Sequence, residues 1–185
     1  MNGRNSPIRL AALSFLLADP NPHSSAIIHS ILRGFGATRI IEVRSRHHAI
    51  QVLSDQRVDM MLIEPSLPEG GGLAFVRSIR QDDKSPWRFI PMLIVTADTR
   101  ASMIKAARDC GANMVIAKPV SPASLYERLT WVAINPRSFA GAPPPDSEAR
   151  QSPRNDVAIS FDGGPTLSQN EIDSLLQGTA FVDPL

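Results

Sequence analysis

The sequence predicts an α/β protein in which helices cover both faces of a parallel β-sheet. Two observations support this fold class. Short apolar runs alternate with segments that repeat apolar residues at helical spacing, through about the first three quarters of the chain. Each strand-plus-helix unit takes roughly 20–30 residues, as parallel strands with crossover helices require. Hydrophobic residues make up 43% of the 185 residues, which is enough for a substantial core.

Five apolar runs are typical of buried strands. The predicted strands span residues 10–18, 38–43, 60–63, 89–96 and 114–117. Pro91 lies near the start of the fourth run, where a strand tolerates proline. The first run loosely resembles a secretion signal, but it ends in Asp19-Pro20 without a small-x-small cleavage pattern. We therefore expect a strand there.

The segments between these runs have helical spacing. Five helices are predicted, from Pro22 to the glycines at 34 and 36, and over residues 47–54, 72–79, 101–110 and 121–133. Pro22 and Pro122 suit the first turn of a helix, and Gly111 suits a helix end. The face of the first helix is predicted to contain Ala26, Ile27, Ile31 and Leu32.

Five strands alternating with five helices leave few topologies, because such crossovers are right-handed. A flavodoxin-like doubly wound sheet with strand order 2-1-3-4-5 is the natural arrangement. Functional groups in such sheets gather where the strands end, at the carboxyl edge. Glu64 directly follows the run 60–63 and precedes the glycine-rich loop 69–72, so we expect it at this edge.

The composition excludes several classes of function. A net charge of +1 argues against a nucleic-acid-binding domain built on bulk electrostatics. The single cysteine, Cys110, excludes a disulfide framework and a cysteine-based zinc site, and its place before Gly111 favours a buried apolar role. No stretch approaches the roughly 20 apolar residues of a membrane span, so we expect a cytoplasmic protein without membrane contact.

The character of the chain changes after the predicted domain, which spans residues 7–134. Residues 135–166 are rich in Pro, Gly and Ser and have little periodic hydrophobicity. Such a segment buries too little apolar surface to offset the entropy of ordering, so we expect a disordered linker.

Residues 167–178 contain a compact helical signal, followed by a tail at 179–185. Ser168 and Glu171 have capping-box spacing. Ile172, Leu175 and Leu176 fall on one face of the predicted helix. A helix of about ten residues is marginal in water, so its apolar stripe favours docking on a protein surface.

The residues at the predicted strand ends resemble those of a response-regulator receiver domain, the phosphorylatable module of two-component signalling. In chain order they are Asp19, Glu64, Leu67-Pro68, Gly72, Thr96-Ala97 and Lys118-Pro119. The resemblance covers the first 134 or so residues. It implies that position 64 takes a phosphoryl group from a phosphohistidine, that acids after the first strand help bind Mg²⁺, and that Thr96 and Lys118 hold the phosphoryl group.

The sequence departs from the family pattern at four positions. Glu64 replaces the phosphoacceptor aspartate, Pro20 the second acid after the first strand, Gly71 an acid of the following loop, and Val115 the switch aromatic of the fifth strand. The extra methylene of Glu64 displaces its oxygen, and misplacement of this size lowers a rate on the order of 10²-fold. Pro20 supplies no ligand to Mg²⁺. We expect no catalytic residue, no cofactor, and weak or absent Mg²⁺ binding.

Two interpretations of Glu64 stay open. In the first, the longer carboxylate reaches toward Lys118 and Thr96 as a phosphoryl oxygen would, and it holds an active-like state. In the second, Glu64 forms a structural ion pair with Lys118 that compensates a buried charge. The missing aromatic ring at Val115 favours the second interpretation.

The segment at 167–176 resembles the N-terminal segment by which the flagellar switch protein FliM binds the chemotaxis receiver CheY; the alternative is a generic amphipathic helix. In that system the segment docks on the face formed by the fourth helix, fifth strand and fifth helix. The corresponding residues here are Ile104, Arg108, Val115, Ala117 and Val120.

A receiver and a receiver-binding segment on one chain predict a non-enzymatic, phosphorylation-independent adaptor in chemotaxis or flagellar motility signalling. Its partner is another receiver, a flagellar switch component, or its own domain. One alternative is a receiver that phosphorylation still regulates. Another is a motility effector that binds a cyclic dinucleotide through Arg137, Arg150 and Arg154 of the linker.

Overall fold

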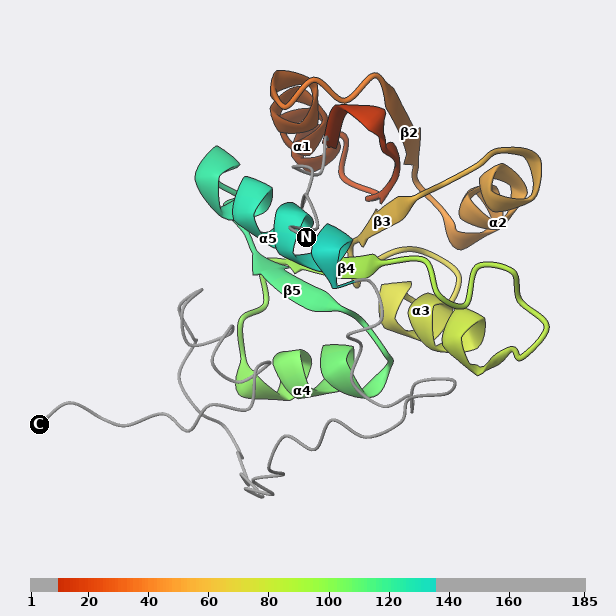
Figure 1. Ribbon diagram of the computed structural model, residues 1–185. Helices are drawn as coiled ribbons and strands as arrows, with labels where there is room; N and C mark the ends of the chain where they lie inside the picture. The colour runs from red at the N-terminus through yellow and green to blue at the C-terminus, as the bar shows by residue number, and fades with distance from the viewer. Residues whose placement is uncertain (1–9, 136–185) are drawn as a thin grey trace, which may run out of the picture.

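A computed structural model describes residues 10–135 as a five-stranded parallel sheet with helices on both faces (Figure 1). The strands are β1 (Ser14–Ala18), β2 (Arg39–Val43), β3 (Met60–Ile63), β4 (Met92–Thr96) and β5 (Met114–Ala117). The helices are α1 (Pro22–Gly34), α2 (Arg46–Asp55), α3 (Gly72–Gln81), α4 (Ala101–Asp109) and α5 (Pro122–Ile134), after a short 3-10 turn η1 (Leu10–Ala12). The strand order is β2-β1-β3-β4-β5, which confirms the predicted flavodoxin-like topology. From residue 136 onward, the predicted linker, the segment 167–178 and the tail lie outside the described residues.

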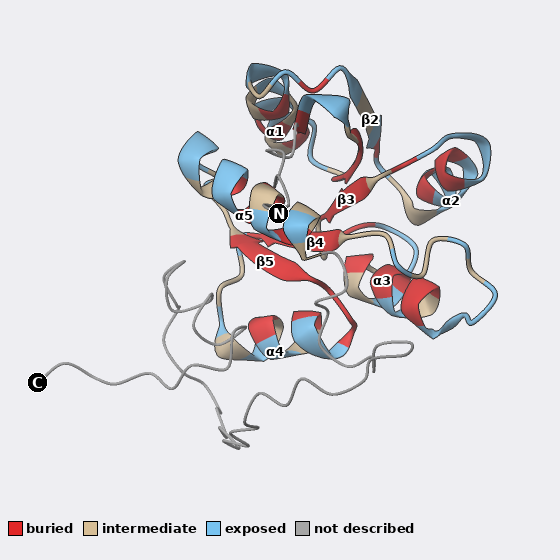
Figure 2. Ribbon diagram, in the orientation of Figure 1, coloured by how far each residue is buried: buried red, intermediate tan, exposed pale blue. Residues whose placement is uncertain are grey.

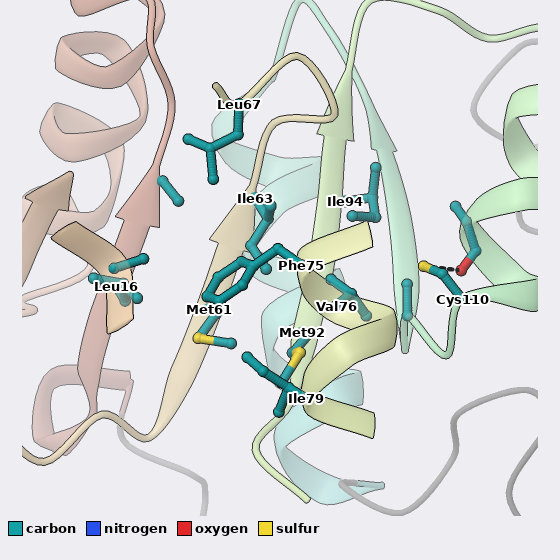
Figure 3. Close-up of a cluster of buried hydrophobic side chains, with 14 of the residues drawn as sticks. Leu16, Met61, Ile63, Leu67, Phe75, Val76, Ile79, Met92, Ile94 and Cys110 are labelled. Carbon is teal, nitrogen blue, oxygen red and sulfur yellow. Dashed lines mark hydrogen bonds between the residues drawn. The ribbon is translucent and has the colours of Figure 1, made fainter. Parts of the chain in front are cut away.

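Two apolar cores lie on opposite faces of the sheet, because successive side chains of a strand point to opposite sides. Leu16, Met61 and Ile94 belong to the core beneath α2, α3 and α4 (Figure 3). Phe15 and Leu17 belong to the core beneath α1 and α5. Strands β1, β3 and β4 are therefore buried along their whole length (Figure 2), as expected for a parallel sheet covered on both faces.

Two strands are shorter than the apolar runs that predicted them. Residues 10–12 form η1, which the Leu13 N–H closes by donating to the Leu10 carbonyl, and pairing of β1 with β2 begins only at Ser14. Residues 89–91 precede β4, and the side chain of Phe89 is 49% exposed. A strand is defined by backbone pairing with a neighbouring strand in the right register. Apolar composition alone does not produce this pairing.

The buried face of α1 differs from the predicted one. Ser25, Ile28 and Leu32 are buried, whereas Ala26 and Ile27 are exposed. The hydroxyl of Ser25 donates a hydrogen bond to Glu42 on β2. The buried face of α1 therefore includes a polar residue. A prediction from apolar residues alone misplaces this face by one position.

A buried arginine joins α3 to the loops before β4 and β5. The Arg80 guanidinium donates to the carbonyl oxygens of Gly111 (2.9 Å), Ile90 (2.9 Å) and Arg88, and to Oδ1 of Asn113 (2.8 Å). Burial lowers the pKa of Arg80 to about 10, so the group remains a cation at neutral pH. These bonds anchor both loops at the amino edge of the sheet, where β4 and β5 begin.

Cys110 is buried at the end of α4, as the sequence predicts. Its thiol donates a 3.0 Å hydrogen bond to the Ala107 carbonyl (Figure 3), and burial raises the pKa of the thiol. Within residues 10–135, none of the helices combines the length and apolar character that crossing a membrane requires.

Candidate functional site

Four of the predicted site residues meet at the carboxyl edge of four adjacent strands, β1, β3, β4 and β5. They are Asp19, Glu64, Thr96 and Lys118. The Glu64 N–H donates to the Ala18 carbonyl of β1 (2.9 Å), and the Lys118 N–H donates to the Thr96 carbonyl of β4 (2.8 Å). The strands thus end level with one another, and side chains that are far apart in the sequence lie together.

The ammonium group of Lys118 lies between two carboxylates. Its Nζ donates to Oδ2 of Asp19 at 2.9 Å and to Oε2 of Glu64. The Asp19 side chain is 2% exposed, that of Glu64 13% and that of Lys118 19%. Burial acts to lower the pKa of Lys118, but the hydrogen bonds and charges of Glu64 and Asp19 outweigh burial and raise that pKa. The cluster carries a formal charge of −1, since one ammonium faces two carboxylates.

Asp19 is also held from the start of α1. Its Oδ1 accepts a 2.8 Å hydrogen bond from the N–H of Asn21, and the Asn21 side chain caps α1 by accepting from the N–H groups of His23 and Ser24. Asn21 is not among the site residues that the sequence predicts. An Asn before a proline at the first helical position is a recognisable cap signal and could have identified it.

The hydroxyl oxygen of Thr96 accepts a hydrogen bond from the N–H of Asp98 at 3.0 Å. The Asp98 carboxylate in turn accepts from the Arg100 guanidinium at 2.9 and 2.6 Å, and these hydrogen bonds lower the pKa of Asp98. Within the described residues, Thr96 makes no hydrogen bond to Glu64. The Thr-x-Asp spacing is a turn signal, and it could have indicated that Thr96 orders the loop between β4 and α4.

The loop between β3 and α3 depends on two glycines. A Cβ on Gly72 would overlap the Glu64 carbonyl oxygen and lie 2.8 Å from Cγ2 of Ile63. Gly71 has a φ of 84°, in the left-handed region that favours glycine, so an acid at this position would be strained. The carboxylate of Glu69 accepts from the His47 N–H at 2.8 Å and ties this loop to the start of α2.

The predicted partner-binding face is only partly accessible. Ile104 is 2% exposed and Val115 is 0% exposed, and both lie in the core between α4 and the sheet, so neither side chain is open to a partner in this structure. Arg108 is exposed, and Ala117 and Val120 are half-buried. Ile104 is on the sheet-facing side of α4, and Val115 points to the same core from β5. The sequence around these two residues does not show that their side chains face the core.

Comparisons with known proteins agree with the fold. The response regulator receiver domain model matches residues 15–130. The chain is 24% identical to the sensory/regulatory protein RpfC of Xanthomonas campestris over 167 residues. These residues cover 90% of this chain but only 21% of RpfC. The chemotaxis protein CheY of Pseudomonas aeruginosa is 26% identical over 117 residues, which cover 63% of this chain and 93% of CheY.

Solved structures with the same fold include one that is 28% identical in sequence. It is the receiver domain of a sensor histidine kinase from Pseudomonas aeruginosa, described with a magnesium ion in its active-site cleft. It aligns with a TM-score of 0.57 and 28% identity, and the match covers 66% of this chain and 98% of that domain. The strand-end cluster, the 2-1-3-4-5 sheet and these matches agree: the chain belongs to the response regulator receiver domain family of two-component signalling.

Proposed function

We propose that this receiver works without phosphorylation, as a cytoplasmic protein-interaction adaptor in chemotaxis or flagellar motility signalling. One observation carries the proposal: the Lys118 ammonium is held by the carboxylates of Asp19 and Glu64. In the family this lysine holds the incoming phosphoryl group. Here two side chains of the same protein already neutralise it.

Phosphoryl transfer needs an attacking oxygen in line with the phosphorus and cations around the transferred group. For Glu64 to attack, its carboxylate would have to leave Lys118. Mg²⁺ requires near-octahedral oxygen ligands. Pro20 offers no carboxylate, and Asp19 is engaged by Lys118 and by the Asn21 N–H. The residues present therefore fit Mg²⁺ poorly, and no phosphoryl transfer step is assigned to them.

The adaptor role is supported by the segment at 167–178 and its likeness to a receiver-binding segment. That segment carries Glu171 and Asp173 beside its apolar stripe. The solvent side of α4 carries Arg108 and Lys105, whose opposite charge suits such a segment. A receiver of the CheY kind that presents a comparable face is the partner we expect.

The first test uses a small phosphodonor such as acetyl phosphate with Mg²⁺. We expect no phosphorylation of the wild-type chain by intact-mass measurement. The variant Glu64→Asp/Pro20→Asp restores the phosphoacceptor aspartate and the second acid after the first strand, and a phosphorylatable chemotaxis receiver run in parallel controls for the donor. Mg²⁺-dependent phosphorylation of the wild type that Glu64→Ala abolishes would overturn the proposal.

The second test measures binding of the full chain to a purified CheY-type receiver by calorimetry. We expect binding that Leu175→Ala/Leu176→Ala removes and that Asn170→Ala/Gln177→Ala, a matched pair away from the apolar stripe, retains. Binding that survives loss of both leucines would assign the interaction elsewhere. Binding of a cyclic dinucleotide that depends on Arg137, Arg150 and Arg154 would favour a nucleotide-responsive effector instead.

A further inference from the structure

Helix α5 carries large apolar residues on its solvent side as well as on the side that faces the sheet. Leu125, Leu129 and Val132 are fully buried against the sheet. On the solvent side, Tyr126 is 48% exposed, Trp131 38% and Ile134 51%. We call Tyr126, Trp131 and Ile134 the outer α5 face. Glu127 is the one exposed charge of this helix, since Arg128 is 7% exposed.

This distribution differs from that of the other helices in the described part of the chain. The solvent side of α4 carries Lys105, Arg108 and Asp109. The remaining large exposed hydrophobic residues between positions 10 and 135 lie apart from one another, namely Ile27 on α1, Ile50 on α2 and Phe89 in the loop before β4. Several large exposed apolar residues on one helix mark a surface that protein often covers, whereas single exposed apolar residues are ordinary. The outer α5 face (Figure 2) therefore fits a surface that another segment covers.

We propose that residues 167–178 of the same chain dock on the outer α5 face. This inference rests on the proposed function, because it states where the receiver-binding segment lies when no partner receiver holds it. Docking in cis would make the chain's own α5 a competitor of the partner. The partner would then capture the segment only by displacing it from α5.

The path of the chain supports an intramolecular contact. The described structure ends at Asn135, directly after Ile134 of the outer α5 face. Residues 136–166 separate this point from the segment, and a random coil of 31 residues has an r.m.s. span of roughly 30 Å. Helix α5 has 13 residues and is about 20 Å long, so every part of it is within reach. The effective concentration of the segment at α5 is then in the millimolar range, which favours docking in cis over a second copy at low concentration.

The chemistry of the two surfaces also matches. Ile172, Leu175 and Leu176 form a stripe at i, i+3 and i+4, the pattern of an apolar helix face. The outer α5 face offers two aromatic rings and an isoleucine, with Glu127 as its exposed charge. The segment and Glu127 are both acidic, so their charges oppose this contact and burial of apolar surface drives it. We therefore expect docking on α5 to persist or to strengthen slightly as salt rises, whereas docking over Lys105 and Arg108 would weaken.

The test is paramagnetic broadening in the full chain. A nitroxide is attached through Gln177→Cys, and Cys110→Ala removes the native thiol. In a ¹⁵N-labelled sample we expect loss of the Trp131 indole signal and of the Tyr126 and Ile134 amide signals, with the Lys105 and Arg108 amides retained. Leu175→Ser/Leu176→Ser should restore the lost signals. Ile134→Ser should weaken the broadening, and Ile27→Ser, which removes a similarly exposed isoleucine from α1, should not.

Three outcomes would overturn the proposal. Broadening centred on Arg108, Ala117 and Val120 places the segment on the other face, and no broadening within residues 10–135 shows that it does not dock. Broadening in a mixture of labelled chain and nitroxide-bearing unlabelled chain shows capture by a second copy. Each outcome leaves the adaptor function standing if the same chain still binds a CheY-type receiver through Leu175 and Leu176, so the two proposals fail separately.

Discussion

The Nζ atom of Lys118 donates a 2.9 Å hydrogen bond to Oδ2 of Asp19, although 99 residues separate them in the sequence. The two residues follow β5 and β1, and β3 and β4 lie between these strands in the sheet. The long lysine side chain therefore reaches across the carboxyl edge and binds Glu64 on the way. A single cation thus holds together the ends of three strands.

Lys118→Met should destabilise the fold by about 3 kcal/mol, because it leaves the buried carboxylate of Asp19 without its cation. Urea unfolding followed by circular dichroism measures this change. The triple variant Lys118→Met/Asp19→Asn/Glu64→Gln removes all three charges and should recover most of the loss.

Lys105→Met is the matched control for Lys118→Met. Lys105 forms an exposed ion pair with Asp109 at 3.0 Å on α4, and such pairs contribute little. A Lys118→Met variant as stable as Lys105→Met would contradict the role assigned to the cluster.

Gly72→Ala should destabilise the protein by about 1–3 kcal/mol, because its Cβ would overlap the Glu64 carbonyl oxygen and force the loop after β3 to move. Gly34→Ala is the matched control, since a Cβ there meets no atom within 4 Å and Gly34 is helical. It should stabilise α1 by up to about 1 kcal/mol. Thermal unfolding of both variants tests the pair, and equal effects would contradict the close approach at Gly72.

Arg80→Met should destabilise the protein by roughly 3 kcal/mol or more, because several buried carbonyl groups lose a charged donor. Arg80→Lys should retain only part of the stability that Arg80→Met loses, because an ammonium group cannot reproduce the planar set of guanidinium donors. Arg108→Met, an exposed arginine on α4, should change little. Denaturant midpoints compare the three variants, and full rescue by lysine would show that charge alone matters at this position.

The contact between α1 and β2 should depend on pH. The hydrogen bond from Ser25 is the largest effect that lowers the pKa of Glu42; burial opposes it, and His29 and Arg44 add to the lowering. A carboxyl with a lowered pKa stabilises the fold above its ordinary value of 4.5, and this stability is lost as pH falls through the folded-state pKa below that value. Glu42→Gln should therefore be less stable than wild type at neutral pH.

Unfolding midpoints measured across the acidic range test this dependence. The difference between wild type and Glu42→Gln should shrink as pH falls below 4.5. Glu127→Gln, which alters an exposed glutamate on α5, should show no comparable trend. A difference that stays constant with pH would indicate that Glu42 acts through packing and not through its charge.

The sequence by itself determined the fold class, the strand order and the residues that end each strand. Apolar runs and helical spacing are local patterns, and the handedness of crossovers leaves few topologies for them. The resemblance to the receiver pattern singled out Asp19, Glu64, Thr96 and Lys118, and parallel strands that end on the same side of the sheet place these four residues at one edge.

Only the tertiary structure decided how those residues are paired and which neighbours are accessible. It turned Thr96 toward Asp98, brought Lys118 to both carboxylates, and buried Ile104 and Val115 beneath α4. It also shortened β1 and β4, because backbone pairing with a neighbouring strand sets a strand's ends. Side-chain direction and strand pairing depend on contacts between segments far apart in the chain, so no local pattern contains them.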